Sequence, residues 1–216
     1  MTLSRDAVRT LYDRFGARQD SQSWYEDAAL AALTAHGRFD TAQAVLELGC
    51  GTGRYAATLL DAPLPPHATY RGLDLSGTMI DLTAERLRRF GGRAAAVQAD
   101  VTEPVAAPDG AYDRIVSTYL FDILSEAEVR VVLAEARRLL RPGGLLCLAS
   151  LTQGGGLLPR AVSFAWQAVY RVAPARLGGC RAVRLPDYLD GWAIEHRATV
   201  VSRGMTSEAV IARPDR

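Results

Sequence analysis

The chain after residue 43 alternates between two hydrophobic periods, one typical of strands and one typical of helices. Short apolar runs rich in β-branched residues and leucine predict buried strands at 44–49, 69–74, 94–98, 112–118 and 144–151. Apolar residues spaced three or four apart predict helices at 53–61, 76–90 and 125–140. Strands that alternate with helices in this way predict a doubly wound α/β sheet.

The last part of the chain departs from this rhythm. Two strand-like runs, 192–201 and 205–213, flank a short turn, so we expect them to pair as an antiparallel hairpin. Before this hairpin, the pattern predicts a helix from about Pro159 to Val172 that is interrupted by Pro174. Apolar residues occur around most of its circumference, so we expect this helix to be buried as a cap on the sheet.

Length and composition predict a single domain. The 216 residues are 49% hydrophobic, which suffices for one buried core. Within 1–216 we expect four parts, namely an N-terminal helical lid at 1–40, a core at 41–152, a cap at 153–192 and the terminal hairpin at 193–216.

The charged residues exclude several function classes. Basic and acidic residues number 25 and 24, so the chain lacks the basic excess that nucleic acid favours, and we expect no nucleic-acid partner. All the basic residues are arginine, and the chain contains no lysine. Schiff-base chemistry on lysine, a Walker lysine and a Ser-Lys dyad are therefore excluded.

The three cysteines, Cys50, Cys147 and Cys180, are scattered and form no C-x-x-C pair. We therefore expect no metal site and no disulfide framework. The N-terminal stretch MTLSRDAVRTLYDRF lacks the apolar core of a signal peptide, and no apolar run approaches the roughly 18 residues of a membrane span. The cytoplasm is the expected compartment.

The glycine-rich turn VLELGCGTG at the end of the first strand is the most informative motif. Gly49, Gly51 and Gly53 allow a ligand to approach the backbone closely. A dinucleotide turn requires G-x-G-x-x-G, but Arg54 stands where its third glycine would be. Glu47 would also add a negative charge beside a pyrophosphate, and it suits a cationic ligand better.

E-x-G-x-G-x-G after a strand resembles the first motif of the class I S-adenosylmethionine (SAM) dependent methyltransferases. The terminal hairpin and the turn in LLRPGGLLCLAS resemble the same family. The resemblance implies a Rossmann-like seven-stranded sheet with SAM as the cofactor, S-adenosylhomocysteine as the product and no metal. The cationic sulfonium and amino groups of SAM would explain Glu47.

The ends of the second and third strands extend the resemblance. A carboxylate at Asp74 can accept hydrogen bonds from both ribose hydroxyls. Asp100 and the backbone of Val101 resemble the segment that binds the adenine edge, with Leu75 and Met79 as its apolar walls. The resemblance implies the following cofactor-binding residues: Tyr12, Glu47, Gly49, Cys50, Gly51, Gly53, Asp74, Leu75, Met79, Asp100, Val101 and Thr118.

The fourth strand and the residues after it, YDRIVSTYLFDIL, resemble the segment that faces both methyl donor and acceptor in this family. The N/D-P-P-Y/F motif of enzymes that methylate adenine or glutamine is missing, which disfavours those acceptors. If the reaction needs a base, the candidates are Tyr119, Asp122 and His196. As a polar position of an alternating strand, His196 is expected to face solvent.

The acceptor is expected to bind in a largely apolar pocket beside the N-terminal lid and the cap helix. Tyr12 through Tyr25 resembles the lid of ubiquinone/menaquinone-type methyltransferases, although Gln19-Asp20 replaces its second Tyr-Asp pair and disfavours a quinone. The expected acceptor-side residues are Tyr25, Tyr119, Trp166 and Tyr170. A lipid-borne acceptor is an alternative, with Arg160, Arg171 and Arg176 as an interfacial edge.

The sequence therefore predicts methyl transfer from SAM to a small molecule by in-line displacement, with the accepting atom open among N, O and C. The alternatives are a module that binds SAM or S-adenosylhomocysteine without methyl transfer, and an enzyme for a lipid-borne acceptor. The expected partner is a small-molecule acceptor. Contact with a membrane is possible but less favoured, and the sequence indicates no oligomeric state.

Overall fold

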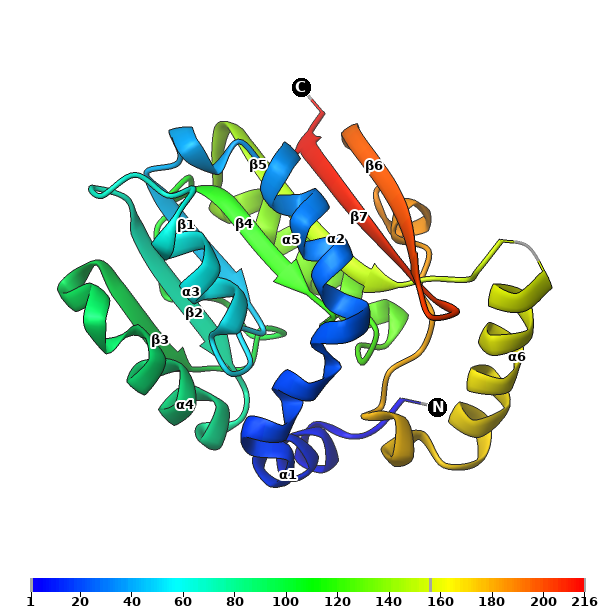
Figure 1. The fold of residues 1–216 in the computed structure, drawn as a ribbon. Helices are drawn as coiled ribbons and strands as arrows, with labels where there is room; N and C mark the ends of the chain where they lie inside the picture. Colours follow the sequence, from blue (N-terminus) through cyan, green and yellow to red (C-terminus); the bar gives the residue numbers. More distant parts are fainter. Residues whose placement is uncertain (1, 156, 216) are drawn as a thin grey trace.

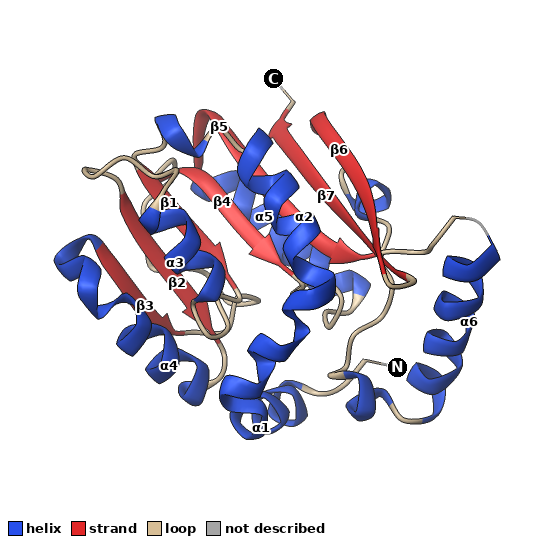
Figure 2. Ribbon diagram, in the orientation of Figure 1, coloured by secondary structure: helices blue, strands red, loops and turns tan. Residues whose placement is uncertain are grey.

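The computed structural model describes residues 2–155 and 157–215, which form one seven-stranded sheet with helices on both faces (Figures 1 and 2). The strand order is β3-β2-β1-β4-β5-β7-β6. Strands β1 to β5 run parallel, whereas β7 is antiparallel to both β5 and β6. This arrangement confirms the α/β class I methyltransferase fold expected from the sequence.

The strands occupy the positions that the hydrophobic pattern predicts. They are β1 (Ala44–Leu48), β2 (Thr69–Asp74), β3 (Ala94–Gln98), β4 (Tyr112–Thr118), β5 (Leu140–Leu151), β6 (Trp192–Ser202) and β7 (Met205–Pro214). The α-helices are α1 (Arg5–Phe15), α2 (Ser23–His36), α3 (Arg54–Asp61), α4 (Gly77–Leu87), α5 (Glu126–Leu139) and α6 (Leu157–Val172). Short 3₁₀ segments include η1 (Gly16–Gln22) and η4 (Pro174–Leu177).

Local chemistry explains several element boundaries. The Ser76 side chain accepts a hydrogen bond from the Met79 N–H at the start of α4, and Ser125 forms a capping box with Glu128 at the start of α5. The hairpin turn places Arg203 and Gly204 at φ 49° and 88°, as a two-residue turn between twisted antiparallel strands requires.

Successive side chains of the central strands enter two different cores. Leu46 and Ile115 pack with α5 on one face of the sheet. Val45 and Val116 pack with α2 and α3 on the other face. Because both faces are covered, the parallel strands are apolar on both sides, and the ligand has to bind at the strand ends.

The second half of the N-terminal region, helix α2, is part of the hydrophobic core. Ala29 and Leu33 of α2 are fully buried in the core on the α3 face, and α2 packs across β5, β6 and β7 (Figure 1). The lid expected at 1–40 is therefore confined to α1 and η1, whereas α2 is part of the sheet's helical layer. The alternation of small and large apolar residues in α2 allows this close contact with the sheet.

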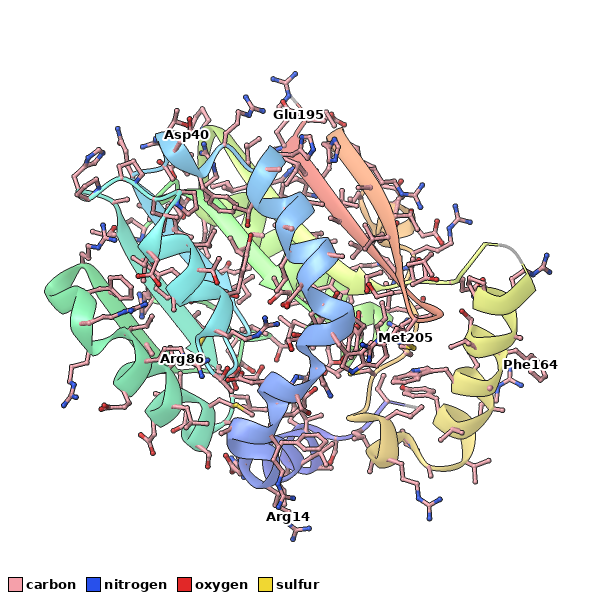
Figure 3. The ribbon with its side chains drawn as sticks, viewed as in Figure 1. Arg14, Asp40, Arg86, Phe164, Glu195 and Met205 are labelled. Atoms are coloured by element: carbon pink, nitrogen blue, oxygen red, sulfur yellow. The ribbon has the colours of Figure 1, made fainter. Side chains whose placement is uncertain are left out.

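The cap helix α6 forms where the sequence predicts a helix, but the expectation that it is buried is wrong. Phe164 is 75% exposed and Val172 is 87% exposed. The helix lies beyond the β6–β7 end of the sheet, and Phe164 points away from the rest of the molecule (Figure 3). Within the described ranges, no helix combines the length and the apolar character needed to cross a membrane.

Asp113 at the start of β4 joins three parts of the fold. Its buried carboxylate accepts a hydrogen bond from the Gln43 N–H at 2.8 Å and pairs with Arg141 at 2.6 Å and Arg114 at 3.7 Å. The guanidinium of Arg114 is also buried and donates to the Gly37 carbonyl. Asp113 therefore provides a hydrogen-bond acceptor for the Gln43 N–H and a negative charge beside the buried guanidinium of Arg114.

We expect Asp113→Ala to lower the free energy of unfolding by about 3–5 kcal/mol, because it leaves Arg114 buried without its carboxylate. Urea denaturation measures this loss. Asp109→Ala is the control, since its carboxylate is 80% exposed and its ion pair with Arg138 contributes no more than about 1 kcal/mol. Equal effects of the two substitutions would contradict the assigned role of Asp113.

Candidate functional site

A cavity that opens to solvent, with a volume of about 100 Å³, lies at the carboxyl ends of the central parallel strands. The N-terminal segment and α2 close its other side. Many of the residues expected from the sequence line it, from five separate parts of the chain. They are Tyr12, Glu47, Gly49, Cys50, Gly51, Asp74, Leu75, Asp100, Val101, Thr118 and Tyr119.

The glycine turn between β1 and α3 forms the floor of this cavity. Gly49, Gly51 and Gly53 have φ values of 74°, 54° and 73°, a conformation that other residues rarely adopt. A Cβ atom on Gly51 would meet nothing within 4 Å, so this part of the turn is open to a ligand. A Cβ atom on Gly53 would lie 2.9 Å from Thr83, so Gly53 permits packing against α4 and does not line the cavity.

Glu47 is a buried carboxylate on the cavity wall, with 1% exposure. Its oxygens accept hydrogen bonds from the Tyr70 hydroxyl at 2.6 Å and the Thr118 hydroxyl at 3.4 Å. Both partners are uncharged. Burial therefore dominates and raises the pKa of Glu47 to about 7, with the hydroxyl hydrogen bonds opposing the shift.

Asp74 at the end of β2 holds the glycine turn in place. Its carboxylate accepts from the Gly51 N–H and from the Ser76 N–H, both at 2.9 Å. Burial raises the pKa of Asp74, and these two backbone hydrogen bonds oppose the increase. The carboxylate is thus oriented by backbone donors while it lines the cavity.

Asp100 follows β3 and lies on the adjacent wall. One of its oxygens accepts from both the N–H and the hydroxyl of Thr102, at 2.9 and 2.7 Å. This local turn fixes the side chain beside Leu75 and Val101. Met79 is fully buried in α4 and does not line the cavity, so it does not form the apolar wall that the sequence predicts for it.

Tyr119, the first residue after β4, lines the cavity and is one of the residues expected to contact the acceptor. Its φ of 55° is unusual for a bulky residue, and its hydroxyl donates to Ser207 at 3.0 Å. The ring of Tyr25 packs edge-on against it, with centroids 5.7 Å apart. Tyr25 therefore supports Tyr119 from behind and is not part of the cavity lining.

Several contacts attach α1 and η1 to the rest of the molecule. Asp13 of α1 accepts a hydrogen bond from the Ser76 hydroxyl at 2.5 Å, and Arg5 pairs with Glu128 of α5 at 2.5 Å. Asp20 of η1 pairs with Arg86 of α4 at 2.6 Å. Tyr12 lines the cavity, and its hydroxyl donates to the Gly178 carbonyl, just after η4, at 3.3 Å.

Two candidate bases lie away from the cavity lining. Asp122 is fully buried and accepts hydrogen bonds from the Ser150 hydroxyl and the Leu151 N–H, so it braces β5. Burial raises its pKa to about 7. His196 lies on β6 at the far edge of the sheet and stacks on His36 with centroids 3.5 Å apart. The hydrophobic pattern of a strand does not show where that strand lies in the sheet. Because β6 is the outermost strand, His196 lies far from the cavity.

Two expected acceptor-side residues of α6 are also separate from the cavity. Trp166 donates from its indole to the Cys180 carbonyl at 2.9 Å and lines a smaller cavity with Leu151 and Met205. Tyr170 is likewise not part of the main cavity lining. The position of α6 beyond the sheet edge explains both placements.

A charged pair that the sequence patterns do not single out lies in the cavity wall. Glu26 of α2 and Arg54 of α3 form an ion pair at 2.6 Å, and Arg54 also pairs with the more exposed Asp27. Burial raises the pKa of Glu26, although Arg54 opposes this shift. Only the position of Arg54, in place of a glycine, gave a signal in the sequence.

Comparison with known proteins decides the family. A methyltransferase-domain family matches residues 45–144, which include β1 through the start of β5 and the site residues between them. This part of the chain is a class I SAM-dependent methyltransferase domain.

Relatives of the chain differ in their acceptors. Over 107 residues the chain is 41% identical to the malonyl-[acyl-carrier protein] O-methyltransferase of Paenibacillus sp. (strain JDR-2), covering 47% of the chain and 36% of the relative. It is 34% identical over 133 residues to a ubiquinone/menaquinone biosynthesis C-methyltransferase of Rhizobium meliloti (strain 1021), covering 60% and 48%. The chain thus spans less than half the length of these two relatives.

A solved structure confirms the fold. A SAM-dependent methyltransferase from Methanosarcina mazei superposes with a TM-score of 0.66 at 17% identity, covering 84% of this chain and 96% of the other. At this identity the likeness concerns the fold alone.

We expect Glu47→Gln to stabilise the protein in a pH-dependent way. The glutamine keeps the size of the side chain without a buried charge: its oxygen can accept from one of the two hydroxyls, and its amide N–H can donate to the other. Because the folded pKa of about 7 exceeds the ordinary value of 4.5, wild-type Glu47 opposes folding increasingly as pH rises between these values. The variant should gain up to about 3 kcal/mol at pH 8 and almost nothing at pH 4.5.

Urea denaturation at the two pH values measures this difference. Glu103→Gln is the control, because Glu103 is an exposed carboxylate in the loop after Asp100. A gain for Glu47→Gln that is the same at both pH values would contradict the role of its buried charge.

Proposed function

We propose that the protein transfers a methyl group from SAM to a small-molecule acceptor bound in the same cavity. The observation that carries the proposal is Glu47, a carboxylate buried in the cavity wall with only neutral hydrogen-bond partners. A cationic ligand would supply the missing positive charge and favour the ionised carboxylate. SAM has such charges on its amino group and its sulfonium.

The remaining cavity residues match the other parts of SAM. The Asp74 carboxylate retains acceptor capacity beyond its two backbone bonds, which suits the ribose hydroxyls. Asp100 and the Val101 backbone suit the adenine edge, and Leu75 offers it an apolar wall. The open face of Gly51 leaves space for the ligand at the floor.

When bound, SAM supplies an electrophilic methyl group, so the protein's main task is to hold the acceptor in line with it. Orientation of this kind can supply roughly 7–11 kcal/mol of the barrier. Tyr119 and its support by Tyr25 and Ser207 provide a rigid surface at the junction of the two binding regions. Leu30, Leu120 and Ile123 make the neighbouring wall apolar, which favours a largely apolar acceptor.

Glu26 is the base candidate that the geometry favours for an amine or hydroxyl acceptor. It lines the cavity, whereas Asp122 and His196 do not. Its Oε2 atom is paired with Arg54, and burial raises its pKa, so it can hold a proton more readily than an exposed glutamate. For a carbon acceptor that needs no base, the same pair would position a polar group of the acceptor.

Titration calorimetry with SAM tests the cofactor site. We expect Asp74→Ala and Glu47→Gln each to weaken SAM binding at least about tenfold, because each removes a charged partner worth about 1.5–3 kcal/mol. Asp81→Ala on the exposed side of α4 is the matched control and should bind as the wild type does. Absence of wild-type binding, or unchanged affinity in Asp74→Ala, would refute the assignment.

Methyl-labelled SAM incubated with a cell extract tests the transfer itself. We expect Glu26→Gln to reduce label incorporation about 10²–10⁴-fold if the acceptor is an amine or hydroxyl. Asp27→Asn is the matched control, because this neighbouring residue also pairs with Arg54 but is 63% exposed, so label transfer should persist.

The outcomes of the labelling experiment separate the alternatives. Equal activity of Glu26→Gln and wild type would contradict the proposed proton acceptor. SAM binding without any label transfer would instead support a binding module. Partition of the label into the lipid fraction would identify a lipid-borne acceptor.

A further inference from the structure

The outward face of α6 is an apolar surface without a partner in the described structure. Phe164, Val169 and Val172 are 75%, 41% and 87% exposed. Ala161, Ala165 and Ala168 lie between them and are also exposed. These six residues, which we call the α6 outer face, recur every three or four positions and therefore form one continuous stripe along the helix.

Unlike an ordinary surface helix, α6 has apolar residues on the side facing solvent as well as on the side facing the protein, where Val162 and Trp166 lie. Such a helix turns its apolar stripe toward the core. In α6 the side facing the protein includes Trp166, which bonds to the Cys180 carbonyl, and Ser163, which accepts from the Gly154 N–H. The helix is thus held by its other side, and the stripe remains available for contact.

The charges around the stripe have one sign. Across α6 and η4, positions 157–177, the sequence contains three arginines and no acidic residue. Arg160 and Arg171 are exposed on α6, and Arg176 is exposed in η4 just after it. A helical arrangement places Arg160 and Arg171 next to Phe164 along one border of the stripe. The complementary partner is therefore an apolar layer with a negatively charged border.

We propose that the α6 outer face binds the surface of an anionic lipid bilayer. Amphipathic helices with arginine beside an apolar face lie in the plane of such interfaces, where apolar side chains enter the headgroup boundary and cations meet the lipid charges. The helix projects from one end of the molecule, so a flat surface can reach it (Figures 1 and 3). This contact is peripheral, since α6 is not a membrane-spanning helix.

The α6 outer face is connected to the lid through a short chain of contacts. The Trp166 indole bonds to the Cys180 carbonyl, while the Tyr12 hydroxyl of α1 bonds to the Gly178 carbonyl two residues earlier. A bilayer bound to α6 would therefore lie on the side of the molecule where cap and lid meet.

Vesicle co-sedimentation of the full chain tests the surface. We expect binding to vesicles of phosphatidylcholine with 30% phosphatidylglycerol, on the order of the anionic fraction that such contacts require, and little binding to pure phosphatidylcholine. The double variant Phe164→Ser with Val172→Ser should bind the anionic vesicles at least about tenfold more weakly, because it removes the two most exposed apolar side chains. Arg160→Gln with Arg171→Gln should weaken binding and reduce its dependence on salt.

Val131→Ser with Val201→Ser is the matched control, since these valines are 49% and 55% exposed on α5 and β6. It should bind as the wild type does, and thermal melting of all variants checks that they are folded. Wild type that stays in the supernatant at low salt, or equal losses in the α6 and control variants, would overturn the proposal. Loss of a concentration-dependent dimer in the α6 variant without any vesicle binding would also overturn it, in favour of a second copy of the chain. The assay contains no SAM, so its failure would leave the proposed methyl transfer untouched.

Discussion

The burial of the Glu47 carboxylate at the end of β1 is the constraint on which the site depends. A buried carboxylate with neutral partners is unfavourable to folding, and it is held only because β1 pairs with β2 and β4 on its two sides. These strands bring the Tyr70 and Thr118 hydroxyls to its two oxygens. Sheet pairing therefore keeps this carboxylate buried at the cavity wall before any ligand is bound.

Asp74 connects this charge site to the glycine turn. Its carboxylate accepts the Gly51 N–H, so the acid at the end of β2 determines the shape of the turn that follows β1. The same group faces the cavity, so in the proposed function one side chain holds the turn and also contacts the ligand.

The sequence predicts which residues gather at one end of the sheet, because topology places them there. Glu47, Asp74, Asp100 and Thr118 all lie at or just beside strand ends, and parallel strands bring such ends to one edge. The rest of the cavity wall depends on how helices pack on the sheet, which the hydrophobic pattern of the sequence does not show. The Glu26–Arg54 pair forms only because α2 crosses the sheet beside α3, and the pattern of β6 does not show that His196 occupies the outermost strand.

The exposed stripe of α6 is a second feature that the hydrophobic pattern alone could not place. Apolar residues at helical spacing indicate that a face needs a partner, but they do not indicate whether that partner is the sheet. Here the sheet-facing side uses Trp166 and backbone hydrogen bonds, and the stripe is left outside. The proposed donor residues lie at the strand ends, whereas the proposed acceptor wall comes from α2 and the segment after β4. Changes in α2 and in that segment can therefore alter the acceptor while the strand ends keep the donor.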